Sequence, residues 1–155
     1  MMRQQLKHVV TAMLCIASVF VSLSAQAALG GNRESIAIDH QALAMKSTTV
    51  TSGSGYQIHE LQHPNGASVK EFVSPQGKVF AVHWEGSAPA NLSQILGDHY
   101  AEYLSALKNT PHSHHLVQIK QDNLVVTHIQ YLRNFSGNAY VPSLVPASVD
   151  PTQLN

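Results

Sequence analysis

The sequence predicts an α+β fold, an antiparallel sheet of about five strands with one main helix packed on one face. Two turn sequences, HPNG at residues 63–66 and SPQG at 74–77, separate three short runs rich in β-branched and aromatic residues. One long amphipathic run follows these three, and two more short apolar runs come after it. The predicted order is therefore strand, strand, strand, helix, strand, strand.

The first three strands are predicted at residues 56–61, 67–73 and 79–85. In each turn, Pro presets the φ angle of an early position and Gly follows two residues later, which is typical of hairpin turns. Lys70 and Glu71 interrupt the apolar residues of the second strand and indicate a strand with one wetter face. Strict alternation in the third strand puts two sets of side chains on opposite faces. Val79, Ala81 and His83 lie on one face, and Phe80, Val82 and Trp84 lie on the other.

The main helix is predicted from Asn91 to about Lys108. Asn91 is a favoured N-cap residue, and Gln94 three positions later completes a pair resembling a capping box. Apolar residues recur at helical spacing and form one wide stripe: Leu92, Ile95, Leu96, Tyr100, Tyr103, Leu104 and Leu107. The last two strands are predicted at residues 116–120 and 124–131, around a polar turn.

The two ends of the chain are less regular. Residues 35–38 (SIAI) resemble a short strand, and Asp39 is placed to cap a short helical turn. Residues 47–55 (STTVTSGSG) have the composition of a mobile connector. From Phe135 onward we expect an irregular, Pro-rich tail, because Pro142, Pro146 and Pro151 each lack a backbone N–H.

The N-terminus has the three parts of a secretory signal peptide. Arg3 and Lys7 precede an apolar run at residues 9–23, and Ala-Gln-Ala at 25–27 is a cleavage pattern. We expect cleavage after Ala27, an N-terminal segment and connector at 28–55, and a single α+β domain at 56–155. The expected location is periplasmic or secreted, with no membrane span after cleavage, and the one cysteine, Cys15, would be removed.

Composition excludes one class of partner. The 155 residues carry a formal net charge of zero, and no basic run is present, so the sequence offers no electrostatic reason to bind nucleic acid. It does not indicate an oligomeric state.

His112, His114 and His115 form the densest group of metal-ligating residues. Neutral imidazoles are good ligands for Zn or Cu, so these three are the candidate metal site. The alternative is a polar loop after a helix, where histidines near the C-terminus complement the helix dipole.

Other histidines suggest weaker sites. His99 lies three residues before Glu102 on the predicted helix, within contact range for a general base and its partner acid, but we favour a packed histidine, because His99 falls on the apolar side of the helix. His83 and Glu85 share a strand face, whereas His59 and Glu60 point to opposite faces. No nucleophile motif accompanies these residues: there is no Gly-x-Ser-x-Gly elbow, and the chain after residue 27 has no cysteine. We therefore recognise no catalytic constellation and predict no cofactor.

Several short segments, in a fixed order, are similar to the family of bacterial exported proteins catalogued as domain of unknown function 2844. They are ALGG at 28–31, the run at 59–86, Leu92 with Leu96-Gly97, NLVV at 123–126, Arg133 with FSG at 135–137, and AYVP at 139–142. The resemblance implies export from a bacterial cell but no activity, ligand or catalytic residue. Residues 127–131 depart from the family's pattern, which contains Gly there, so a role for His128 does not follow from it.

From these features we expect an exported bacterial envelope or periplasmic protein that acts as a non-catalytic binding or interaction module. Its partner is an unknown envelope protein or a small ligand. The alternative is a periplasmic metal-binding protein that uses His112, His114 and His115, with His99 or His128 as a further ligand.

Overall fold

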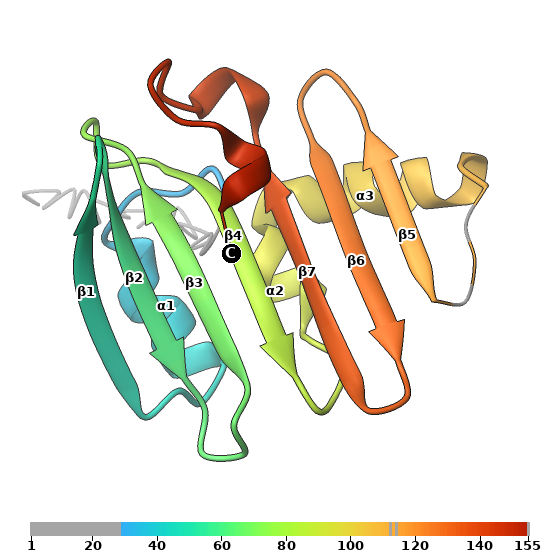
Figure 1. Cartoon of the computed structure of the whole chain (residues 1–155), viewed down its shortest axis with the longest axis horizontal. Helices are drawn as coiled ribbons and strands as arrows, with labels where there is room; N and C mark the ends of the chain where they lie inside the picture. The colour runs from blue at the N-terminus through green and yellow to red at the C-terminus, as the bar shows by residue number, and fades with distance from the viewer. Residues whose placement is uncertain (1–28, 112, 114, 155) are drawn as a thin grey trace, which may run out of the picture.

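The computed structural model describes residues 29–111, 113 and 115–154, which form one antiparallel sheet with helices on one side (Figure 1). The predicted signal peptide, residues 1–27, lies outside the described residues. The sheet has seven strands: β1 (Ser47–Gly53), β2 (Tyr56–Gln62), β3 (Ser68–Val73), β4 (Val79–Gly86), β5 (Leu116–Lys120), β6 (Val125–Tyr131) and β7 (Asn134–Tyr140).

The strands lie in the order β1-β2-β3-β4-β7-β6-β5, and every neighbouring pair is antiparallel. Two meanders, β1 to β4 and β5 to β7, therefore join where β4 pairs with β7. The α+β class with an antiparallel sheet is confirmed, but the prediction of about five strands is wrong. The two missed strands are β1, predicted as a connector, and β7, predicted as part of the tail.

The first helix, α1 (Ser35–Ala42), includes the residues predicted as a strand, so that prediction is wrong. A four-residue apolar run does not distinguish a strand from a buried helical turn, and packing decides between them. In the helix, Ile36 and Asp39 lie three residues apart and are both buried. Figure 1 places α1 behind β2 and β3.

The main predicted helix is divided into three pieces: α2 (Leu92–Leu96), a 3₁₀ turn η1 (Gly97–His99) and α3 (Tyr100–Asn109). Gly97, the first residue of η1, has a φ of +51° and a ψ of −124°, which lie outside the α-helical region and which glycine adopts readily. The predicted cap is confirmed, because the side chain of Asn91 accepts a hydrogen bond from the backbone N–H of Gln94.

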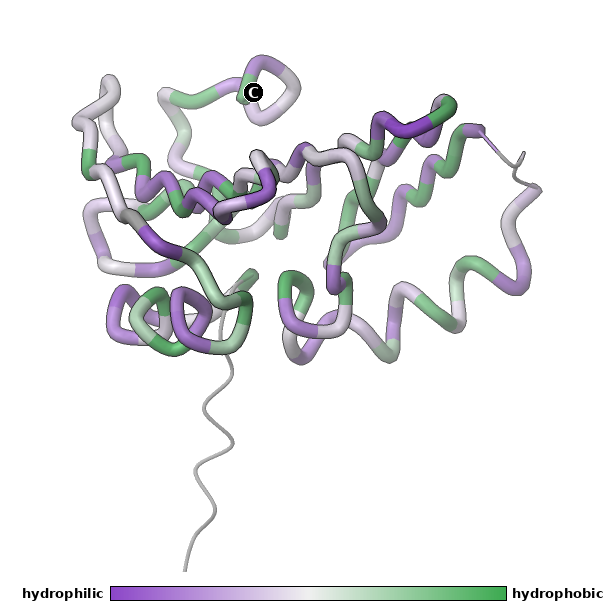
Figure 2. The backbone as a smooth tube through the Cα atoms, turned by 90° about the horizontal axis from the view of Figure 1, so that it is seen from below, coloured by the Kyte–Doolittle hydropathy of each residue, from purple (hydrophilic) through white to green (hydrophobic). Residues whose placement is uncertain are grey.

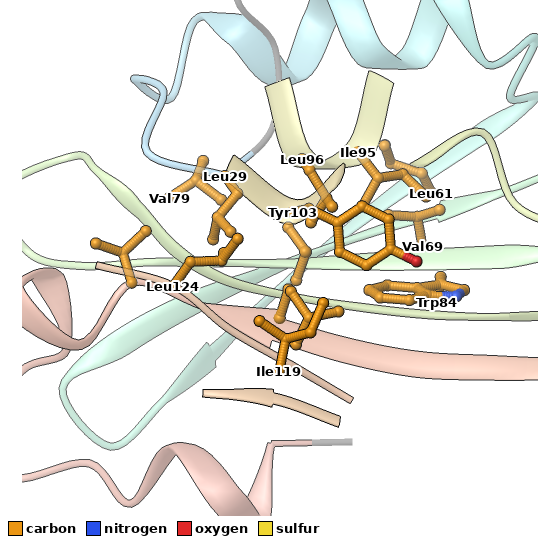
Figure 3. Close-up of a cluster of buried hydrophobic side chains, with 14 of the residues drawn as sticks. Leu29, Leu61, Val69, Val79, Trp84, Ile95, Leu96, Tyr103, Ile119 and Leu124 are labelled. Atoms are coloured by element: carbon orange, nitrogen blue, oxygen red, sulfur yellow. The ribbon is translucent and has the colours of Figure 1, made fainter. Parts of the chain in front are cut away.

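The main core lies between the helices and one face of the sheet. It includes Leu61, Val69 and Trp84 from the strands, together with Ile95, Leu96 and Tyr103 from the helices (Figure 3). We call the opposite side of the sheet the open face. Figure 2 shows the helices on one side of the sheet and the C-terminal tail on the other.

A β-bulge changes the predicted alternation in β4. Phe72 pairs with Ala81 and Val73 pairs with Val79, so Phe80 is the extra residue. Val79 consequently packs in the main core, and Phe80 joins Phe72 and Tyr56 on the open face. The predicted sides of Val79 and Phe80 are therefore wrong, whereas Val82 and Trp84 lie together in the main core as predicted.

The tail after β7 is irregular apart from two 3₁₀ turns, η2 (Pro142–Leu144) and η3 (Pro151–Gln153). It returns across one end of the open face, where Leu144, Val145, Val149 and Leu154 pack around Phe72 and Phe80. A polar row remains beside it, made by residues that pair in register across six strands: Glu60, Lys70, His83, Asn138, Thr127 and Gln118. Across the described residues, no helix combines the length and apolar character needed to span a membrane.

Candidate functional site

A cavity of about 250 Å³ lies at the end of the sheet, and we call it the end cavity. Three segments surround it: the end of α1, the β2–β3 turn, and the connection from β4 to α2. Its rim includes Ala42, Asn65, Ala88 and Asn91. The cavity is thus built by the loops around the sheet, between elements that are far apart in the sequence.

Local hydrogen bonds shape these loops. In the β2–β3 turn, His63 Nδ1 lies 3.2 Å from the backbone N–H of Asn65, and Asn65 Oδ1 accepts from the N–H of Ala67 at 2.9 Å. Gly66 completes the turn with a φ of +88°. On the other rim, Asn91 Oδ1 accepts from Ser93 Oγ at 2.7 Å as well as capping α2. Both rims are therefore fixed by side chains that the sequence places at turn and cap positions.

The floor of the end cavity is apolar. Met45, Val69, Trp84 and Ile95 line it, and each belongs to the main core. Figure 3 shows Val69, Trp84 and Ile95 in this buried cluster. Trp84 is the one tryptophan of the chain. Concave apolar surfaces with a few polar groups at the rim are typical of ligand-binding pockets.

Polar groups near the rim include Ser68 and Glu85, which pair across β3 and β4. The Ser68 hydroxyl donates to Glu85 Oε1 at 3.3 Å. His63 and Glu85 are the titratable residues of the lining, and Glu85 is the one that contacts a hydroxyl, that of Ser68. The rest of the lining offers a mainly apolar surface to a bound group.

Beside the cavity floor, Trp84 is part of an aromatic cluster that ties α3 to the sheet. The Tyr103 hydroxyl lies 3.0 Å from His128 Nε2, and the His128 ring lies 6.5 Å from the Trp84 ring. Gly137 on β7 lies under both, since a Cβ there would come within 2.4 Å of Trp84 and 2.5 Å of His128. His128 therefore occupies a packed position in the helix–sheet interface.

Two of the three residues of the predicted metal site, His112 and His114, lie outside the described residues. His115 is exposed, its Nδ1 lies 3.0 Å from the backbone oxygen of Gln130, and its ring contacts that of Tyr131. Among the described residues, no group of three or more His, Cys, Asp or Glu side chains is arranged to hold a metal ion.

Of the three weaker candidate pairs predicted from the sequence, the structure brings one within contact distance, places one on a common face and separates one. His99 Nδ1 and Glu102 Oε2 lie 3.5 Å apart, at the separation the helix predicts. His83 and Glu85 lie on the open face, and Lys70 pairs with His83. Burial lowers the pKa of His83, the Lys70 ammonium lowers it further, and Glu85 opposes the change. His59 lies under the helices and Glu60 on the open face, as the alternation of β2 requires.

The sequence did not reveal a buried polar cluster between α1 and the sheet. Asp39 and Glu71 are 0% and 1% exposed, and Gln94 Nε2 donates to Asp39 Oδ1 at 2.7 Å. Lys70 and Glu71 together led us to expect one wetter face on this strand, but Glu71 lies on the face that the helices bury. Burial raises the pKa of Glu71 well above its usual value, and hydrogen bonding and repulsion from Asp39 raise it further. The one available signal was an acidic residue inside an apolar strand.

No curated protein and no solved structure matches the chain. Residues 25–154 match the model of a family described as "Protein of unknown function (DUF2844)". This match covers nearly the whole chain, including every helix and strand described above. The chain therefore belongs to the DUF2844 family.

Proposed function

We propose that the protein is an exported bacterial envelope protein, periplasmic or secreted, which acts as a non-catalytic binding module. The signal-peptide pattern at residues 1–27 supports export. The test is expression of the full chain in a bacterium, followed by cell fractionation and mass spectrometry of the N-terminus. Export predicts a product that begins at Ala28 in the periplasm or medium, and a product that keeps Met1 in the cytoplasm would contradict it.

The ligand that suits the end cavity is a small, mainly apolar molecule. The observation that carries this proposal is the apolar floor formed by Met45, Val69, Trp84 and Ile95 beneath a rim of loops. Its volume of about 250 Å³ lies just under the range of about 300–1,000 Å³ that is usual for ligand pockets. The occupant is therefore smaller than a typical cofactor.

Trp84 offers a direct readout, because its fluorescence reports on the cavity floor and the chain has no second tryptophan. Titration with small neutral compounds, such as cyclohexanol and hexanol, is expected to change this fluorescence in a saturable way. Ala42→Phe at the rim, where Ala42 is exposed, fills the opening and is expected to abolish the response. Ala101→Phe is the matched control, because Ala101 is an exposed alanine on α3 outside the lining.

A saturable response that survives Ala42→Phe would contradict the proposal. Ala88→Phe, from the β4–α2 connection on the rim, provides an independent second variant. Circular dichroism confirms the fold of each variant before titration. No saturable response in the unmodified protein to any of the compounds would also reject the end cavity as a site for apolar ligands.

The alternative proposal is metal binding by His112, His114 and His115. One observation favours it: His115 bonds through Nδ1 to the backbone oxygen of Gln130, and a ring held in this way presents Nε2 to a metal. Isothermal titration with Zn and Cu tests it. Binding that is lost when all three histidines become alanine supports the metal site, and binding unchanged by this substitution ends it.

A further inference from the structure

A second cavity, of about 400 Å³, lies between α1 and the strands β1 and β2, and we call it the α1 groove. Five of its seven lining residues carry a side-chain hydrogen-bond donor. Arg33 precedes α1, His40 and Gln41 belong to it, Thr48 belongs to β1, and His59 belongs to β2. Ile36 and Ala37 complete the lining. Polar side chains from separate parts of the chain thus converge on one groove.

His59 is the most informative of these residues. It is 9% exposed, and its Nε2 is buried without a hydrogen-bond partner among the described residues. A buried polar nitrogen without a partner destabilises the protein, so a ligand that bonds to it recovers this lost free energy. His59 lines the groove and offers such a ligand a hydrogen bond that the protein itself leaves unmade.

The charges around the groove select the kind of ligand. Arg33 is the one permanently charged residue of the lining, and no carboxylate belongs to it. Burial lowers the pKa of His59 and the Arg33 guanidinium lowers it further, which places that positive charge within electrostatic reach of the imidazole. Glu71, which pairs with His59 across β2 and β3, hydrogen-bonds to Asp39 of α1.

We propose that the α1 groove binds an oxyanion, the carboxylate or phosphate group of a small ligand, through Arg33 and His59. A guanidinium offers two parallel N–H donors to such a group, and this pairing is among the strongest hydrogen-bonding arrangements in proteins. His59 donates from Nε2, and Gln41 and Thr48 supply neutral donors at the walls. The groove differs from the end cavity in every lining residue.

Binding is coupled to protonation of His59. A bound anion favours the imidazolium, so the affinity rises as the pH falls through the range in which His59 titrates. Four other titratable groups face or flank this histidine: Arg33 and His40 in the groove, and Asp39 and Glu71 beneath it. The Arg33 guanidinium strengthens anion binding, and the hydrogen bond between the two carboxyls limits their opposition to it.

The test is isothermal titration of the protein with inorganic phosphate and, separately, with succinate, at pH 6 and pH 8. We expect a dissociation constant of about 1 mM or tighter for at least one probe, and tighter binding at pH 6. The probe that binds more tightly, phosphate or succinate, indicates whether the natural ligand carries a phosphate or a carboxylate group. Arg33→Gln and His59→Asn are each expected to weaken binding about tenfold or more.

Arg133→Gln is the matched control, because Arg133 is an exposed arginine in the β6–β7 turn, far from the lining. Arg33 is itself exposed, so Arg33→Gln retains the fold even if the buried His59 does not tolerate substitution. Absence of binding for both probes at both pH values, or binding unchanged by Arg33→Gln, would overturn the proposal. Ala42→Phe fills the end cavity and leaves the α1 groove unchanged. We therefore expect this variant to bind phosphate as the unmodified protein does, and a loss of phosphate binding would contradict a separate site in the α1 groove.

Discussion

The side chains of Asp39 on α1 and Glu71 on β3 hydrogen-bond to each other in the protein interior. Both residues are fully buried, and Gln94 from α2 donates a further hydrogen bond to Asp39. Two carboxyls this close, with little water, cannot both ionise easily, so the pair holds a proton more strongly than an exposed carboxyl does. This contact joins α1, α2 and the sheet.

The first prediction concerns the pH dependence of stability. The pKa of Glu71 is raised in the folded state, so its contribution is fully present below about pH 4.5, its ordinary pKa. That contribution is lost as the pH rises through the folded pKa, at roughly 1.4 kcal/mol for each unit by which the pKa is raised. The side chain in Glu71→Gln stays neutral, so the free energy of unfolding of this variant is not expected to fall at alkaline pH for this reason. Urea unfolding from pH 4 to pH 9 measures this free energy for both proteins.

Glu60→Gln is the control, because Glu60 lies on the open face of the neighbouring strand β2. We expect its stability to follow that of the unmodified protein at every pH. If Glu71→Gln shows the same alkaline loss as the unmodified protein, the proton is not held by this pair.

The second prediction concerns Gly137, over which Trp84 and His128 pack. A Cβ at this position would also lie 2.7 Å from the backbone oxygen of Thr127, an atom that cannot rotate away. Gly137→Ala is therefore expected to lower the free energy of unfolding by about 3 kcal/mol, the upper end of the usual cost of overpacking. Chemical denaturation monitored by circular dichroism measures the loss.

Gly53→Ala in the edge strand β1 is the matched control. A Cβ there would meet the ring of Tyr56, a side chain that can move, and its three nearest atoms all belong to this ring. Its expected cost is about 1 kcal/mol or less. Equal losses for the two variants would mean that packing over Gly137 is not specially tight.

The third prediction concerns the hydrogen bond between Tyr103 and His128. Tyr103→Phe keeps the ring, which stacks on Tyr100 at 6.1 Å, and removes only the hydroxyl. The expected loss of stability is about 1 kcal/mol, and Tyr100→Phe, which leaves this hydrogen bond intact, is expected to lose less. Thermal unfolding compares the two, and a larger loss for Tyr100→Phe would show that the bond contributes little.

The features that could be predicted from the sequence are those decided by neighbouring residues. The two Pro-x-Gly turns form, and Gly66 and Gly77 have the positive φ angles of +88° and +76° that the turn chemistry implies. The cap at Asn91 forms for the same reason. The rim of the end cavity is made partly from the first of these turns and from Asn91, so the sequence predicted these two pieces of local structure, although it did not predict the cavity.

The predictions that were wrong concern features that depend on contacts between residues distant in the sequence. Residues 47–53 contain no apolar alternation, and they form β1 because β2 offers an unpaired edge. The Gly and Asn content of residues 134–140 is not typical of a strand, so the sequence did not predict one. These residues form β7 because they pair with β4 on one side and with β6 on the other. The α1 groove was invisible for the same reason, since Arg33 and His59 meet only when α1 packs on the sheet.

The fourth prediction tests the cap at Asn91. Its Oδ1 accepts from the backbone N–H of Gln94 at 3.3 Å, and the same N–H lies 3.1 Å from the backbone oxygen of Asn91, so the side chain adds a second acceptor at the start of α2. Asn91→Ala is expected to cost about 1 kcal/mol, and Asn91→Asp to keep most of the stability, because Asp is an equally good cap. Denaturant midpoints measure both. Equal losses for the two variants would show that the cap is not the source of the effect.

The last prediction concerns the tail that crosses the open face. Leu154 is 5% exposed and packs with Phe72 and Phe80, which the bulge in β4 brings to that side of the sheet. Leu154→Ala removes buried methyl groups and is expected to cost about 2 kcal/mol, the low end for such a change, because the surrounding segment is irregular and relaxes easily. Leu132→Ala is the matched control, since Leu132 is 80% exposed and is expected to show no loss. If both variants unfold at the same urea concentration as the unmodified protein, the tail contributes nothing to the fold, and the apolar residues beneath it would then be available as a surface for a partner.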